Sequence, residues 1–143
     1  FGKTVVALYI LAQRQVNTLI IVHRRQLLDQ WLERILMFLN LTKKQVGKIG
    51  GGKNKSNGII DVAIMQSLTK NHEIDDLVAN YGQVIFDECH HLSAVSFETV
   101  AKACKAKYVL GLSATFTRKD GHHPIVFIQC GPGTTTSAQN SKL

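Results

Sequence analysis

The sequence is poor in cysteine, with only Cys89, Cys104 and Cys130 among its 143 residues. Cysteines this few and this scattered exclude a disulfide framework and a CxxC zinc site. An odd number of unpaired thiols is typical of proteins in a reducing compartment, so we expect a cytoplasmic protein.

Long apolar runs and a secretory signal are also lacking. No apolar run reaches the ~18 residues that cross a bilayer, so we expect no membrane partner. The chain begins with Phe1 rather than Met, and its first residues do not follow the charged-then-apolar pattern of a signal peptide. We therefore expect the sequence to be part of a longer protein.

Acidic residues are scarce relative to basic ones. Ten Asp and Glu stand against seventeen Lys and Arg, which gives a net charge of +7 and a pI near 9.5. Hydrophobic residues make up 45% of the chain, so it can bury a core of one domain. The basic excess favours a polyanionic partner, nucleic acid first, although many basic domains are only soluble ones.

Short apolar runs alternate with helical stretches along the chain. Residues 24–38 have apolar side chains at three- and four-residue spacing, which predicts an amphipathic helix. Continuous apolar strands separated by helices indicate an α/β fold whose mostly parallel sheet has helices on both faces. The runs that predict strands are 18–22, 62–65, 83–86, 108–112 and 125–128.

The same pattern places one domain at residues 1–130. Residues 50–58 are rich in Gly, Lys and Asn, which predicts a flexible basic loop. From residue 131 the composition changes to Gly, Thr, Ser, Gln and Asn, so 131–143 are expected to form a poorly ordered tail.

Ligands of such sheets bind at the carboxyl ends of the strands, so the polar residues there are the candidates for chemistry. Gly2-Lys3-Thr4 opens directly into an apolar helix, as the second half of a phosphate-binding loop does. In such a loop Lys3 would reach the terminal phosphates, and the Thr4 hydroxyl would bind Mg²⁺. The alternative is an ordinary helix start.

Two further strand ends carry polar residues. Asp87-Glu88 follows the run 83–86, where one carboxylate could bind Mg²⁺ and its neighbour could orient water. The alternative is an exposed acidic turn. Ser113 and Thr115 terminate the run 108–112 and could hydrogen-bond nearby carboxylates, or could simply cap the strand.

Basic and amide side chains suggest contacts to nucleic acid. Arg24 and Arg25 lie between a strand and a helix, where guanidinium groups can bind phosphates. Gln66 and Ser67 offer neutral hydrogen bonds at another strand end. The alternative is a solvated helix start, and we expect the lysines near 50–58 to be mobile surface residues. Trp31 is expected in the core.

Taken together in their order along the chain, these segments resemble the first RecA-like motor domain of superfamily 2 helicases. The resemblance is to the DEAD/DEAH-box group that includes the type III restriction-enzyme motors. Five segments carry it: Gly2-Lys3-Thr4 (end of motif I), 21–31 (motif Ia), 63–68 (strand-Gln-Ser segment), Asp87-Glu88-Cys89-His90 (motif II, DExH form) and 111–118 (motif III). Phe116 departs from the group's pattern, which has Pro there.

The resemblance implies ATP and Mg²⁺ as cofactors. Gly2 and Lys3 would bind the phosphates, with Mg²⁺ held by Thr4 and Asp87. Glu88 would activate water. The resemblance also implies that His90 links the nucleotide site to a partner domain, and that two hydroxyl residues couple hydrolysis to nucleic-acid binding: Ser113 and Thr115.

The expected function is that of an ATP-dependent nucleic-acid helicase motor, with DNA favoured over RNA. A second RecA-like domain of the same protein would complete the ATP cleft, so the fragment alone should be nearly inactive. Alternatives are a translocase that moves on duplex without separating strands, and a nucleic-acid-binding relic with a dead nucleotide site. A small-molecule P-loop kinase fits poorly, because it would not explain Ser113 and Thr115.

Overall fold

The computed structural model describes residues 2–70, 73–74, 76–88, 99–100, 102–104, 106–117, 121–130 and 137–140. Its first half contains α1 (Gly2–Arg14), β1 (Thr18–Val22), α2 (Arg25–Phe38), η1 (Lys43–Gln45), β2 (Gly47–Gly50), β3 (Lys53–Lys55) and β4 (Ile60–Ile64). The remainder contains α3 (Met65–Leu68), β5 (Thr69–Lys70), β6 (Glu73–Ile74), η2 (Asp76–Asn80), β7 (Gln83–Phe86), β8 (Tyr108–Thr117), β9 (Gly121–Cys130) and β10 (Ser137–Asn140).

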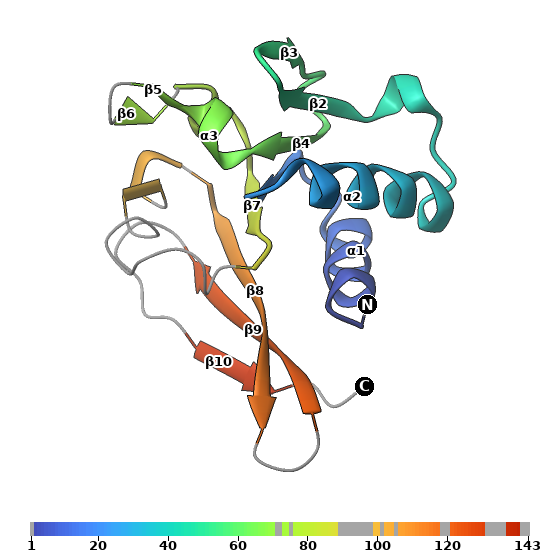
Figure 1. The fold of residues 1–143 in the computed structure, drawn as a ribbon, viewed down its shortest axis with the longest axis vertical. Coiled ribbons are helices and arrows are strands. Elements are labelled where there is room, and N and C mark those ends of the chain that lie inside the picture. Colours follow the sequence, from blue (N-terminus) through green and yellow to red (C-terminus); the bar gives the residue numbers. More distant parts are fainter. Residues whose placement is uncertain are drawn as a thin grey trace.

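Eight strands form one sheet in the order β10-β9-β8-β7-β1-β4-β2-β3 (Figure 1). The five central strands β8, β7, β1, β4 and β2 run parallel to one another. Antiparallel strands flank them, with β3 at one edge and the pair β9 and β10 at the other. The predicted mostly parallel α/β sheet is therefore confirmed.

Side chains alternate between the two faces of the sheet, and each face has its own core. Ile20 and Val22 of β1 pack with residues of α1 and α2 on one face. Leu19 and Ile21 pack on the other face with residues of α3, η2 and the segment around Cys104. Burial raises the pKa of the Cys104 thiol to about 12, so this cysteine serves packing.

The predicted amphipathic helix forms as α2. Its buried side chains are Leu28, Trp31 and Ile35, which lie on one face at three- and four-residue spacing. Arg24 occupies the N-cap position in an extended conformation. Asn40, just beyond the helix, has φ +54°, the left-handed conformation that commonly ends helices.

The predicted strand at 125–128 forms, but its direction differs from the parallel arrangement expected. It lies within β9, which pairs antiparallel to β8. Only three residues separate β8 from β9, too few for the crossover that a parallel pair requires.

The expectation that Ser113 and Thr115 end a strand was also wrong, since β8 continues to Thr117. Pairing between β7 and β8 nevertheless stops at Phe86 and Gly111. The rest of β8 pairs with β9 alone, so it extends beyond the carboxyl end of β7.

The predicted loop at 50–58 is partly a hairpin. Gly51 and Gly52 have φ +61° and +77° and form the turn between β2 and β3, a conformation that glycine adopts without steric cost. Lys48 and Lys55 lie opposite each other across the pair. Of the tail predicted at 131–143, the structure describes Ser137–Asn140, which pair with β9 as β10. The boundary at residue 130 stays a prediction.

None of the helices among the described residues is both long enough and apolar enough to cross a membrane.

Candidate nucleotide and nucleic-acid site

The carboxyl ends of three neighbouring strands meet at one edge of the sheet. Ile21 of β1 lies opposite Phe86 of β7, and Val22 lies opposite Ile64 of β4. The residues that follow these strands therefore lie near one another. A small hollow of about 40 Å³ is lined there by Ile21, Val22, His23, Met65, Phe86, Asp87 and Glu88.

Asp87 directly follows β7 and is almost completely buried, with 6% of its surface exposed. Its backbone N–H donates to the Ile21 carbonyl at 2.9 Å, which continues the pairing of β7 with β1. Its Oδ2 accepts a hydrogen bond of 2.7 Å from the indole Nε1–H of Trp31. The alternative of an exposed acidic turn is therefore excluded for this carboxylate.

Sequence reasoning missed the partnership of Trp31 with Asp87. The prediction that Trp31 is in the core is confirmed, since only 1% of its surface is exposed. A buried indole N–H nevertheless needs an acceptor. A tryptophan at a predicted core position was therefore the signal that a polar group lies nearby, although its spacing could not say which one.

Glu88 is half-buried and has φ +55°. This left-handed conformation is uncommon for a residue other than glycine, and it raises the energy of the backbone. Such conformations gather at active sites, where the surrounding structure holds them.

Thr4 lies in the first turn of α1, with 2% of its surface exposed. Its hydroxyl oxygen lies 3.5 Å from Nη1 of Arg34. Because Arg34 and Trp31 are three residues apart on α2, they lie on the same side of that helix. Thr4 and Asp87, the two predicted Mg²⁺ ligands, therefore both contact one side of α2. Gly2 and Lys3 belong to the same first turn of α1.

The residues predicted to bind nucleic acid also gather at this edge. Arg24 and Arg25 are exposed at the start of α2, which follows β1. Gln66, exposed in α3, lies beyond the end of β4, and its side-chain amide donates to the His23 carbonyl at 3.4 Å. Ser67 is half-buried in α3. The structure thus brings these residues together at the ends of adjacent strands.

A basic pocket adjoins this group, at the end of β2. Its volume is about 250 Å³, and Arg25 lines it together with Lys48, Lys53 and Lys55 of the β2–β3 hairpin. A Cβ atom at Gly51 would lie 3.1 Å from Nη1 of Arg25, so helix and hairpin approach closely. The three lysines are exposed, as expected, but pairing of the hairpin strands gathers them in a way that spacing did not indicate.

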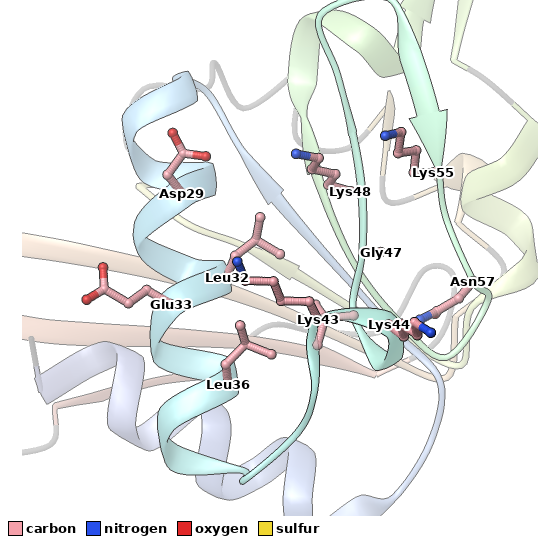
Figure 2. A pocket seen from close by; sticks show the side chains of 11 residues that line it. Asp29, Leu32, Glu33, Leu36, Lys43, Lys44, Gly47, Lys48, Lys55 and Asn57 are labelled. Atoms are coloured by element: carbon pink, nitrogen blue, oxygen red, sulfur yellow. The ribbon is translucent and has the colours of Figure 1, made fainter.

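A larger cavity of about 610 Å³ lies toward the amino ends of the strands, between α2 and the β2–β3 hairpin (Figure 2). None of the predicted site residues whose side chains the structure describes lines it, so it differs from the predicted nucleotide site. Two exposed acids of α2 line it on one side, and lysines of η1 and the hairpin line it on the other. These residues are Asp29, Glu33, Lys43, Lys44, Lys48 and Lys55.

The side chain of Lys3 lies outside what the structure describes, as do those of the three residues predicted to act in coupling. Ser113 and Thr115 belong to the backbone of β8, and their side chains lie outside what the structure describes. His90 lies outside the described residues altogether. Their roles in coupling stay predictions.

Comparison with known families identifies the chain. The family model of the type III restriction enzyme, res subunit, matches residues 1–118. The chain belongs to this family. The expected resemblance to the first RecA-like domain of superfamily 2 helicases is thereby confirmed.

Three relatives align with nearly the whole length of the chain. A DNA 3'-5' translocase XPB2 of Sulfurisphaera tokodaii is 37% identical over 92% of the chain. A DNA 3'-5' helicase XPB of Mycobacterium tuberculosis is 30% identical over 92% of the chain. The L396 protein of Acanthamoeba polyphaga mimivirus, provisionally named an ATP-dependent RNA helicase, is 38% identical over 92% of the chain. The chain spans only 25% to 28% of the length of these relatives.

A solved structure supports the same fold. The UvsW helicase from bacteriophage T4 superposes on 68% of the chain with a TM-score of 0.52, at 23% identity. The chain covers 36% of that structure. The RecA-like arrangement of the sheet and its helices is therefore shared with a helicase.

Proposed function

We propose that this chain is the ATP-binding first motor domain of an ATP-dependent nucleic-acid helicase. In this role it couples ATP hydrolysis to unwinding or translocation. The observation that carries the proposal is the arrangement of Asp87 and Glu88 at the carboxyl end of β7. One carboxylate is buried and oriented by a hydrogen bond, and the next residue is held in a left-handed backbone conformation.

The residues present suit a magnesium ion. A hydroxyl and a carboxylate are oxygen donors of the kind that Mg²⁺ prefers, and Thr4 and Asp87 are both buried beside α2. Mg²⁺ bound there would neutralise charge on the terminal phosphates of ATP. Gly2 and Lys3 would bind those phosphates at the start of α1, where unpaired helix N–H groups attract anions. Glu88 would orient the attacking water.

The exposed edge beside this site would bind the nucleic-acid backbone. Arg24 and Arg25 supply guanidinium groups for phosphates, and Gln66 and Ser67 supply neutral hydrogen bonds. The three lysines of the β2–β3 hairpin extend the positive charge around the basic pocket. We favour DNA as the partner, because XPB2 and XPB are named as acting on DNA. The protein would act in the cytoplasm.

A second RecA-like domain would close over ATP and complete the site. His90, Ser113 and Thr115 would pass changes in the nucleotide site to that domain and to nucleic acid. The chain alone should therefore hydrolyse ATP poorly.

ATP hydrolysis by the native gene product that carries this chain tests the proposal. It should be measured alone, with single-stranded and duplex DNA, and with RNA, beside the variants Lys3→Ala and Glu88→Gln. We expect stimulation by DNA, abolished by both substitutions. Salt-dependent binding of nucleic acid without hydrolysis under any of these conditions would instead indicate a relic.

Strand displacement separates the two motor activities. XPB2 is named a translocase, so movement on duplex without unwinding is a specific alternative. A fluorescently labelled fork substrate should be separated by a helicase and left paired by a duplex translocase, while both hydrolyse ATP.

A further inference from the structure

We propose that Trp31 is a positioning residue for Asp87 and ties the nucleotide site to the helix that begins at the nucleic-acid edge. The inference rests on the proposed function, because it assigns Trp31 a role in orienting a Mg²⁺ ligand. It starts from the hydrogen bond between the Trp31 indole N–H and Asp87 Oδ2.

The surroundings of this hydrogen bond make it effective. Only 1% of Trp31 and 6% of Asp87 are exposed, so water competes little for either group. A hydrogen bond to a charged acceptor is stronger than a neutral one, and low solvent access strengthens it further. The backbone of Asp87 is held by Ile21 at the same time, so the main chain and the carboxylate are both fixed.

The chemical nature of the donor matters for a cation site. A guanidinium or ammonium partner would orient the carboxylate but would also neutralise it. The indole N–H is uncharged, so this hydrogen bond fixes the orientation without itself cancelling the negative charge that would attract Mg²⁺. Groups that orient a metal ligand in this way typically change metal affinity 10–100-fold when they are removed.

The position of Trp31 in the fold links two sites. Trp31 lies six residues after Arg25 on α2, a distance of about 9 Å along a rigid helix. Movement of α2 when Arg24 and Arg25 bind phosphate would therefore shift the donor that orients Asp87. Through Trp31, nucleic-acid binding would tune how well the site holds Mg²⁺ with ATP.

The hydrogen bond itself can be tested without activity. Trp31 is the only tryptophan of the 143-residue chain, so its ¹H–¹⁵N spectrum holds a single indole resonance. We expect Asp87→Asn to move this resonance upfield, because the amide accepts a weaker hydrogen bond than the carboxylate. Asp29→Asn, an equal charge change on the exposed side of α2, should leave it in place. If Asp87→Asn leaves the chemical shift of the indole resonance unchanged, the inference is overturned.

The role of the hydrogen bond is tested by the Mg²⁺ requirement of hydrolysis in the native gene product. Trp31→Phe should raise the Mg²⁺ concentration for half-maximal hydrolysis about 10-fold or more. Excess Mg²⁺ should restore much of the rate. Ile35→Val, a packing change on the same buried face of α2, should leave the Mg²⁺ requirement unchanged.

A second variant separates loss of the N–H donor from any misfolding caused by Trp31→Phe. Benzothienylalanine at position 31 keeps the shape of the ring but lacks the N–H, and it should reproduce the shifted Mg²⁺ requirement. Active enzyme with an unshifted requirement in both variants would overturn the positioning role and leave the proposed function intact. Wild-type protein without nucleic-acid-stimulated hydrolysis would instead overturn the proposed function.

Discussion

The phenol of Tyr81 donates a hydrogen bond to Oδ2 of Asp61, a carboxylate with no exposed surface. The same carboxylate accepts backbone N–H groups of Asn57 and Gly58 at 2.8 and 2.9 Å. Asp61 therefore fastens the turn before β4 to the segment before β7. The pKa of Tyr81 is raised well above its ordinary value near 10. Burial of the phenol is the larger cause, and the contact with the Asp61 carboxylate is the smaller one.

The raised pKa of Tyr81 predicts a loss of stability in alkali. The unfolded chain releases the phenolic proton near pH 10, while the folded chain retains it to higher pH. Stability contributed by the neutral phenol is therefore complete below pH 10 and declines as pH rises above it. Urea unfolding at pH 9 and pH 11 should show this decline. In Tyr81→Phe it should be shallower, and an unchanged slope in that variant would contradict the assignment to Tyr81.

Gly47→Ala should destabilise the fold severely. A Cβ atom at Gly47 would lie 1.9 Å from Oδ1 of Asp61 and 2.7 Å from the Lys55 carbonyl oxygen. Relieving this overlap displaces a buried carboxylate or the hairpin backbone, so we expect a loss of about 3 kcal/mol or more in the free energy of unfolding. Gly52→Ala is the control, because a Cβ there meets open space. Its strained φ should cost only about 1–2 kcal/mol.

The left-handed conformation of Glu88 predicts an order of stability among its variants. Glu88→Gly and Glu88→Ala both remove the carboxylate, but only alanine keeps the strain of φ +55°. The glycine variant should therefore be more stable by about 1 kcal/mol in urea unfolding. Glu33, exposed within α2, provides the control. At that position the alanine variant should be more stable than the glycine variant by about 1 kcal/mol in the free energy of unfolding. Equal stabilities of the two Glu88 variants would contradict the strain.

The basic pocket predicts phosphate contacts that depend on salt. Arg25→Ala and Lys53→Ala should each weaken DNA binding similarly for all sequences, and each should reduce the slope of log affinity against log salt by about 1. Fluorescence anisotropy over a salt series measures this slope. Lys43→Ala removes the same charge near the amino ends of the strands and should leave the slope unchanged. Equal effects at Lys43 and Lys53 would point to net charge rather than to a site.

The pattern of apolar residues predicted much of the fold, because it shows which side chains each strand and helix buries. The β-branched run at 18–22 and the apolar run ending at Phe86 became β1 and β7 with the same bounds. The apolar spacing of α2 identified its buried face. The antiparallel direction of β9 and the hairpin at Lys53–Lys55 depend on strand pairing, which the periodicity of a single segment does not contain.

The candidate site likewise has residues that the sequence predicts and contacts that only the structure shows. Asp87, Glu88 and Thr4 could be found because strand ends and helix starts are visible in the sequence. The link from Trp31 to Asp87 joins residues 56 positions apart, so only the packed structure shows it. The gathering of Lys48, Lys53 and Lys55 beside Arg25 likewise depends on how the hairpin approaches α2.

The most direct test of the nucleotide site separates ATP binding from ATP hydrolysis. Equilibrium binding of ATP with Mg²⁺ should be measured on the native gene product and its Glu88→Gln variant, together with hydrolysis in the presence of DNA. The account predicts near wild-type ATP affinity for Glu88→Gln, with hydrolysis reduced at least about 100-fold, because the role proposed for Glu88 is to orient the attacking water. Undiminished hydrolysis by Glu88→Gln would contradict the account.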